Sequence, residues 1–140
     1  MIDLSGKNLS HSTLIDCHFT GANFAGAIFD HTNLSHSVFR NCNLSRCSFR
    51  YSLLSNVQII DCMVDMADFF SANLDRAYLK NSFFRGSIFH SVNFKNSRIE
   101  GCSFKRACLV NLVGRPAGTA DLDIRHTDPP PHVTLSLIHI

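Results

Sequence analysis

A period of five residues runs through most of the chain. From Leu4 to Leu109, without an insertion, every fifth residue is large and apolar, which gives twenty-two such positions. Two residues before each of them, from residue 12 onward, stands a small or short β-branched residue. A period of five fits neither an α-helix, with about 3.6 residues per turn, nor a strand, which alternates about every two residues. The chain must therefore coil, with the small and the large residue of each five pointing inward and the other three facing outward.

The segment 20–29 shows the pattern in two adjacent repeats. Ala22, Phe24, Ala27 and Phe29 are predicted to point inward, and the residues between them outward. The outward positions along the chain are rich in Asn, Ser, Asp, Thr and Gly, which favour turns over helix interiors. We therefore predict an all-β protein.

The residues resemble those of the pentapeptide repeat proteins, whose consensus is Ala, then Asp or Asn, then Leu or Phe, then two variable positions. The triplets 22–24, 67–69 and 72–74 read Ala-Asn-Phe, Ala-Asp-Phe and Ala-Asn-Leu. The resemblance covers about residues 2–110 and implies a right-handed quadrilateral β-helix, a solenoid of about five and a half coils with four repeats in each. Coils paired about 4.8 Å apart would then form a rod roughly 25 Å long.

Residues twenty apart are expected to lie in columns along this rod. One inward column stacks four consecutive phenylalanines, from Phe29 to Phe89. An outward column stacks His11 on His31, for which a solvated polar corner is favoured over a metal site. Five of the six cysteines occupy the small inward position, so we expect reduced thiols that act as small apolar side chains rather than a disulfide framework.

The repeat is predicted to end at residue 111. Gly114 stands where a large residue is due, and four prolines follow between Pro116 and Pro131. We therefore divide the chain into a β-helix, 1–111, and an irregular or disordered tail, 112–140. Residues 135–140 match one reading frame of a transposon end used in sequencing libraries, so the tail is interpreted as a truncation or adaptor artefact, with a native apolar tail as the alternative.

The net charge differs in sign between two parts of the chain. Residues 1–75 hold four basic residues against seven aspartates, a net charge of −3, whereas residues 76–106 hold seven basic residues against Glu100, a net charge of +6. Such a field can attract nucleic acid, an anionic membrane surface or an acidic protein, or can simply keep a rod soluble. The candidate basic end consists of Arg76, Lys80, Arg85, Lys95, Arg98, Lys105 and Arg106.

Large apolar residues occupy outward positions in the same part of the chain. Several such residues within two coils are more typical of a contact site than of surface variation. We therefore predict an interaction patch for a protein partner or for self-association, made of Met63, Met66, Phe70, Tyr78, Phe83 and Ile88.

Catalytic chemistry finds no support in the sequence. There is no Cys-x-x-Cys pair and no phosphate-binding glycine loop, and Asp61, Asp65 and Asp68 are interpreted as solvated turn residues. We predict a non-enzymatic protein with no catalytic residues, cofactor or metal. No apolar stretch reaches the roughly 18 residues of a membrane span, and the N-terminus lacks the features of a signal peptide. A cytoplasmic location is expected, with export as an effector as the alternative.

The resemblance implies a protein-interaction rod. Within the family, a well-understood role is the protection or modulation of DNA gyrase and related topoisomerases, in which the rod imitates duplex DNA. The alternative is a bacterial effector or adaptor scaffold that associates with a host protein or a membrane. Nucleic-acid binding through the basic end is least favoured, because no aromatic stacking platform accompanies the charge.

Overall fold

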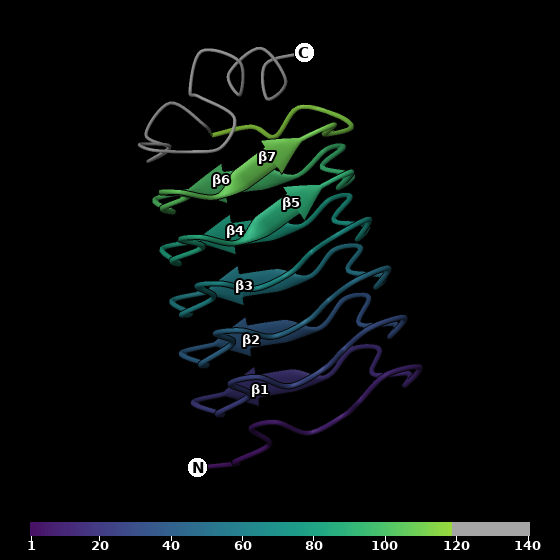
Figure 1. Ribbon diagram of the computed structural model, residues 1–140, viewed down its shortest axis with the longest axis vertical. Coiled ribbons are helices and arrows are strands. Elements are labelled where there is room, and N and C mark those ends of the chain that lie inside the picture. Colours follow the sequence, from purple (N-terminus) through teal and green to yellow (C-terminus); the bar gives the residue numbers. More distant parts are fainter. Residues whose placement is uncertain (119–140) are drawn as a thin grey trace.

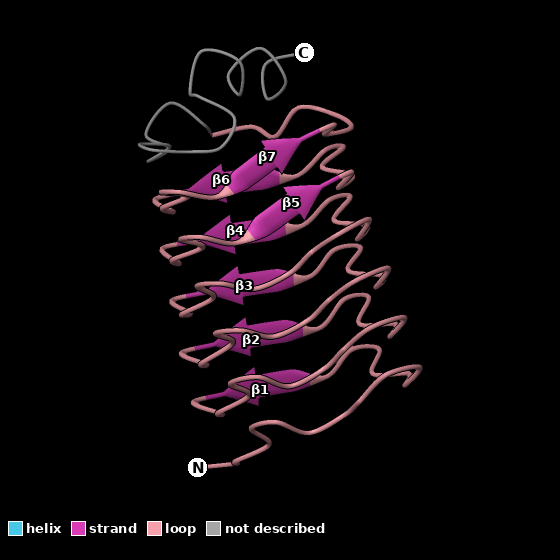
Figure 2. Cartoon of the chain, in the orientation of Figure 1, coloured by secondary structure: helices cyan, strands magenta, loops and turns pink. Residues whose placement is uncertain are grey.

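A computed structural model describes residues 1–118 of the chain as a stack of flat coils (Figure 1). Within this range, its seven strands are each three residues long: β1 (His18–Thr20), β2 (Val38–Arg40), β3 (Gln58–Ile60), β4 (Tyr78–Lys80), β5 (Ile88–His90), β6 (Arg98–Glu100) and β7 (Cys108–Val110). The rest of the described chain is turns and isolated bridges, with no helix among residues 1–118 (Figure 2). The all-β prediction is therefore confirmed.

All strand pairs are parallel, and paired residues lie one coil apart. Strands β1, β2, β3, β4 and β6 form one sheet, and β5 pairs with β7. Phe19 pairs with Phe39, and isolated bridges of the same register join Asp3 to Asn23, Asn8 to Ile28 and Thr13 to Asn33. Each coil of twenty residues therefore has four sides, as predicted for a quadrilateral solenoid.

We name the four sides by their inward large residues. Face A contains Leu4, Phe24, Leu44, Val64, Phe84 and Phe104. Face B contains Leu9, Phe29, Phe49, Phe69, Phe89 and Leu109. Face C contains Leu14, Leu34, Leu54, Leu74 and Phe94, and face D contains Phe19, Phe39, Ile59, Leu79 and Ile99.

Tight turns carry the chain from one face to the next. At the corner between faces A and B, the Ala27 N–H donates to the carbonyl oxygen of Phe24 at 2.8 Å, and Gly26 has a φ of +72°. A positive φ at the third residue is the requirement of a type II turn, which suits Gly and Asn. The same corner position holds Arg46, Met66 and Arg106 at φ near +60°, so longer side chains also occur there.

The core is formed by the inward residues as the sequence predicted. Ala22, Phe24, Ala27 and Phe29 are all buried. On face B the rings of Phe29, Phe49, Phe69 and Phe89 stack nearly parallel, with centroids 5.0, 4.8 and 4.8 Å apart. The predicted aromatic column is therefore continuous through four coils.

The coil continues beyond the boundary predicted at residue 111. The Val113 N–H donates to the carbonyl oxygen of Val92 at 2.9 Å, and the Ala117 N–H donates to that of Ser97 at 2.9 Å. Backbone pairing therefore persists after the period of five is lost, because these bonds depend little on side-chain identity. The rest of the predicted tail, 119–140, including the 135–140 segment, lies outside the described residues.

The cysteines of residues 1–118 are free thiols, as expected. Cys42 and Cys62 stack in one inward column, and each thiol lies near carbonyl oxygens of its own and the preceding coil. Burial raises the pKa of Cys47 to about 12 and that of Cys102 to about 11. Within residues 1–118, no helix is long and apolar enough to cross a membrane.

Candidate interaction surface

Four of the six predicted patch residues lie close together. Met63 and Phe83 are bridge partners in an outward column of face A, and each is 48% exposed. Met66, 59% exposed, stands at the corner between faces A and B, and Ile88, 41% exposed, follows on face B. The coil register brings these four positions together in neighbouring repeats. We call the Met63–Phe83 pair the face A ridge.

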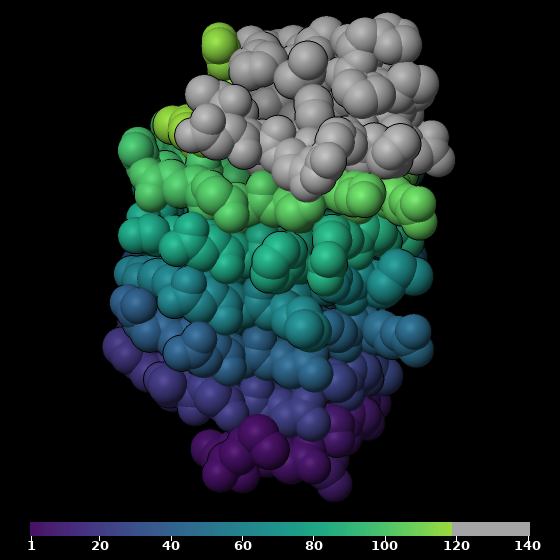
Figure 3. Space-filling view, turned by 90° about the vertical axis from the view of Figure 1, so that its left-hand side faces the viewer, coloured from purple at the N-terminus to yellow at the C-terminus, as the bar shows by residue number. Residues whose placement is uncertain are grey.

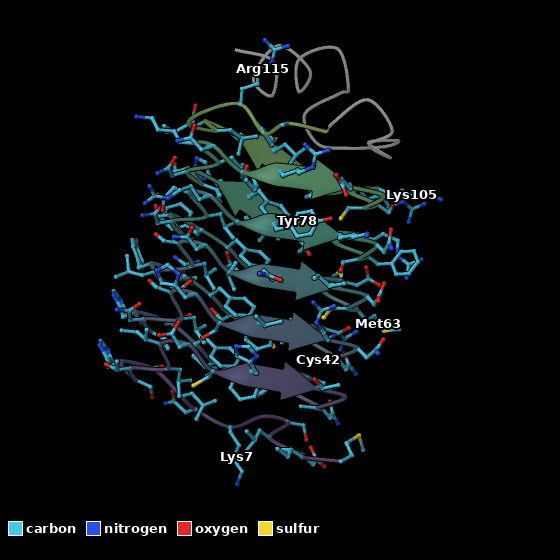
Figure 4. All side chains as sticks on the ribbon, turned by 180° about the vertical axis from the view of Figure 1, so that it is seen from behind. Lys7, Cys42, Met63, Tyr78, Lys105 and Arg115 are labelled. Carbon is cyan, nitrogen blue, oxygen red and sulfur yellow. The ribbon has the colours of Figure 1, made fainter. Side chains whose placement is uncertain are left out.

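The other two predicted patch residues do not join this group. Phe70 is half-buried at the opposite edge of face B, where its ring packs edge-on against Tyr51 and the Arg50 guanidinium lies 4.8 Å from its centroid. Tyr78 belongs to β4 on face D, and its hydroxyl donates to Glu100 at 2.8 Å. In Figure 4 it lies over the strands, whereas Met63 and Lys105 project from one side of the rod.

An ion pair covers the aromatic end of the face A ridge. The Arg85 guanidinium lies 4.6 Å from the centroid of the Phe83 ring, a distance that allows a cation–π interaction. The same guanidinium donates to Asp65 in the coil below, with Nη2 2.7 Å from Oδ2. Asp65 therefore neutralises Arg85 and holds it against the ring.

Two shallow depressions flank the ridge. One, of about 390 Å³, lies toward face B and is lined by Asp65, Met66, Arg85, Gly86, Lys105 and Arg106. The other, of about 320 Å³, lies toward face D and is lined by Asp61, Cys62, Met63, Asn81 and Phe83. Figure 3 views this side of the rod, on which residues 1–110 appear as parallel bands. The ridge and its depressions thus provide both apolar and charged contacts in a small area.

The predicted basic end does not form one surface. Three of its members are in ion pairs: Arg85 with Asp65, Arg76 with Asp75 and Arg98 with Glu100. Two others, Lys80 on face D and Lys95 on face C, lie on different sides of the rod. Lys105 and Arg106 are adjacent and border the larger depression, and neither forms an ion pair within residues 1–118. The charge at this end is therefore distributed around the rod, with one local concentration beside Met66.

A second outward column carries aromatic rings at the corner between faces B and C. His11 stacks on His31 at 4.9 Å, as the column positions predicted, and His31 stacks on Tyr51 at 5.0 Å. Phe70 and His90 of the adjacent column continue the series of rings, with 5.1 Å between their centroids. Sequence reasoning missed this continuation, because the column of Tyr51 itself goes on with Ser71 and Ser91. Within residues 1–118, no group of three or more His, Cys, Asp or Glu side chains is placed to hold a metal ion.

Two models of one protein family match the chain. The model described as pentapeptide repeat region matches residues 2–69, and that described as pentapeptide repeats (8 copies) matches residues 67–106. The chain belongs to the pentapeptide repeat family. Together the two matches cover the coils that contain the face A ridge and both of its depressions.

The chain is similar to solved structures, and the first of the following two shows the same fold. QnrB1, a plasmid-mediated fluoroquinolone resistance protein in a trypsin-treated form, is 13% identical with a TM-score of 0.60, and the match covers 99% of this chain and 96% of that one. HetL, involved in heterocyst differentiation regulation in Nostoc sp. strain PCC 7120, is 14% identical with a TM-score of 0.48 over 90% and 84% of the two chains. A search of curated protein sequences finds no match.

Proposed function

We propose that this pentapeptide repeat protein is a non-enzymatic, protein-binding rod, and that a topoisomerase of the DNA gyrase type is its first candidate partner. The observation that carries the proposal is the group formed by Met63, Met66, Phe83 and Ile88, which are all exposed and occupy neighbouring coils. Exposed apolar residues grouped in this way, next to charged residues, are typical of protein contact sites.

The fold does not require large apolar residues at these positions. The outward column of the ridge holds Asn23, Asn43 and Ser103 in other coils, where the same backbone bridges form. Polar side chains therefore satisfy the column equally well. Met63 and Phe83 depart from this preference in two successive coils, which favours a role in binding over a role in folding.

A topoisomerase partner is supported by family membership and by the shape that the chain shares with QnrB1, a fluoroquinolone resistance protein. Within the family, the rod acts as a substitute for a segment of duplex DNA. This role requires a straight, regular body, and the register of twenty residues per coil, which holds from Asp3 to Val113, provides one. A topoisomerase partner would place the protein in the bacterial cytoplasm, as we also propose.

A gyrase supercoiling assay with the full chain tests the proposal. The protein is expected to change the supercoiling activity, or to protect it from a quinolone, at micromolar concentration. The double variant Met63→Asn/Phe83→Asn should lose most of this effect, because the ridge disappears while the column keeps residues that it already contains. Val38→Asn, an outward change on face D, is the matched control. If the unmodified protein has no effect on gyrase in either assay, the topoisomerase proposal is wrong.

A further inference from the structure

We propose that the larger depression beside the face A ridge binds an acidic protein segment, in which a large apolar side chain is flanked by carboxylates. The site is lined by Met66, Gly86, Lys105 and Arg106 at the corner between faces A and B. This inference rests on the proposed protein-binding function and adds to it the place and the chemistry of the partner segment.

Gly86 allows the Met66 side chain to lie along the corner column, where it presents an apolar surface to a partner. It is the one small residue between Met66 and Arg106 in its corner column, and a Cβ added there would lie 2.6 Å from the Met66 Sδ atom. The Met66 thioether therefore lies over Gly86, in the space that a side chain there would take, and Met66 is itself 59% exposed. Methionine adapts its shape to a partner, and is common at surfaces that accept varied apolar groups.

The charge of the lining determines what can stand next to that apolar group. Arg85 is neutralised by Asp65, with 2.7 Å between Nη2 and Oδ2, whereas Lys105 and Arg106 have no acidic partner within residues 1–118. The depression therefore has a net charge of +2, concentrated on its upper rim. Carboxylates that reach this rim would form charge-assisted hydrogen bonds, which specify the partner and speed its association.

A protein segment suits this site better than nucleic acid. Duplex DNA is bound by many cations aligned along its phosphates, but Lys80 and Lys95 lie on other faces of the rod. Asp65 pairs with Arg85 within the depression, so that only Lys105 and Arg106 are left there to contact a phosphate row. The apolar part of the site is also next to the two cations that have no acidic partner within residues 1–118, an arrangement that matches a mixed acidic and apolar peptide.

Peptide selection on the full-chain protein tests the inference. Random linear peptides displayed on phage are selected against it, and the affinity of an enriched, labelled peptide is then measured by fluorescence anisotropy. Enriched peptides are expected to place Asp or Glu beside Leu, Met or Phe. Gly86→Asn displaces the Met66 thioether from its place over residue 86, and the φ of +67° at Gly86 suits asparagine. This variant should weaken binding about tenfold, and the loss should not depend on salt.

Removing the two cations Lys105 and Arg106 should weaken binding in a way that depends on salt. Lys105→Ser with Arg106→Asn should also weaken binding by about tenfold, and the difference from the unmodified protein should shrink as the salt concentration rises, because exposed charges are screened. Two matched controls should bind within about twofold of the unmodified protein. Gly26→Asn lies in the same corner column, where an added Cβ meets nothing within 4 Å, and Lys95→Ser removes a cation from face C.

Several results would overturn the inference. Enriched peptides without acidic residues would contradict the predicted chemistry, and displacement of the peptide by duplex DNA at low salt would indicate a nucleic-acid site. If Gly86→Asn does not fold, Met66→Gly removes the apolar wall with a residue already present at Gly6 and Gly26 in that column, and unchanged peptide binding by it would also refute the site. Gyrase assays on the same variants separate the two proposals. Peptide binding without an effect on gyrase would refute only the topoisomerase role. An effect on gyrase that is unchanged in Gly86→Asn would refute only this site.

Discussion

Replacing Phe69 by alanine should destabilise the rod by about 4 kcal/mol. Phe69 is fully buried in the third position of the face B stack, with the rings of Phe49 and Phe89 each 4.8 Å away. Truncation of a buried phenylalanine costs about 3–5 kcal/mol, and each aromatic pair contributes about 0.5–1.5 kcal/mol. Because Phe69→Ala removes two aromatic pairs, we expect a cost in the middle of the range of about 3–5 kcal/mol or above it.

The cavity left by this change cannot close easily. The coils above and below are held apart by backbone hydrogen bonds, among them Phe69 N–H to the Ile88 carbonyl at 2.8 Å and Phe49 N–H to the Asp68 carbonyl at 2.7 Å. The neighbouring rings would have to break these bonds to move toward one another. A site that cannot collapse retains most of the penalty of the cavity.

Urea denaturation followed by circular dichroism measures the effect. Leu9→Ala is the matched control, because Leu9 belongs to the same column but is only half-buried in the first coil. It should cost about half as much, with the same dependence on urea. Phe69→Leu should cost about 1–2 kcal/mol, since it keeps an apolar side chain and loses the ring contacts. If Phe69→Ala and Leu9→Ala have equal costs, the stack is not what stabilises the middle coils.

Three further predictions concern packing, thiol reactivity and pH. Ala67→Leu should destabilise the rod by about 1–3 kcal/mol in urea denaturation, because Ala67 is fully buried at a small inward position. Iodoacetamide followed by mass spectrometry should modify the partly exposed Cys17 in the folded protein and Cys47 only after unfolding, since burial raises the pKa of Cys47 to about 12. The hydrogen bond from Tyr78, followed by that from Arg98, lowers the pKa of Glu100, so its stabilising effect is present above the usual glutamate pKa of about 4.3 and is lost as the pH falls through the lowered value. In thermal unfolding, the difference between the unmodified protein and Glu100→Gln should therefore shrink in acid, and a difference independent of pH would contradict this role.

The sequence was sufficient to predict the coil because one rule governs every repeat. Each repeat of five residues has one small and one large inward residue, such as Ala22 and Phe24. The length of the coil, twenty residues, then determines which residues lie above one another in a column. The end of the solenoid could not be predicted in the same way. Val113 and Ala117 continue the ladder through backbone groups, which side-chain periodicity does not report.

The candidate site was predicted less completely, because a column position describes vertical neighbours but not sideways contacts. Met63 and Phe83 were correctly stacked, whereas Tyr78 was assigned to the patch although its column lies on face D. Asp65 and Arg85 lie one coil apart in one column, so a search at a period of twenty could have paired them. The cation–π contact of Arg85 on Phe83 joins two adjacent columns, and only side-chain coordinates reveal it.

In a solenoid, the same backbone site recurs once per coil. The residues of one outward column therefore show which side chains the fold accepts at that site. The column of Met63 and Phe83 elsewhere contains Asp, Asn and Ser, and the corner column of Met66 elsewhere contains Gly and Arg. The departures at Met63, Met66 and Phe83 fall in two successive coils, below Lys105 and Arg106, which have no acidic partner within residues 1–118. Solubility would explain the cations but not the methionines, and the core requires neither. A partner that presents apolar and acidic groups together accounts for both departures at one place.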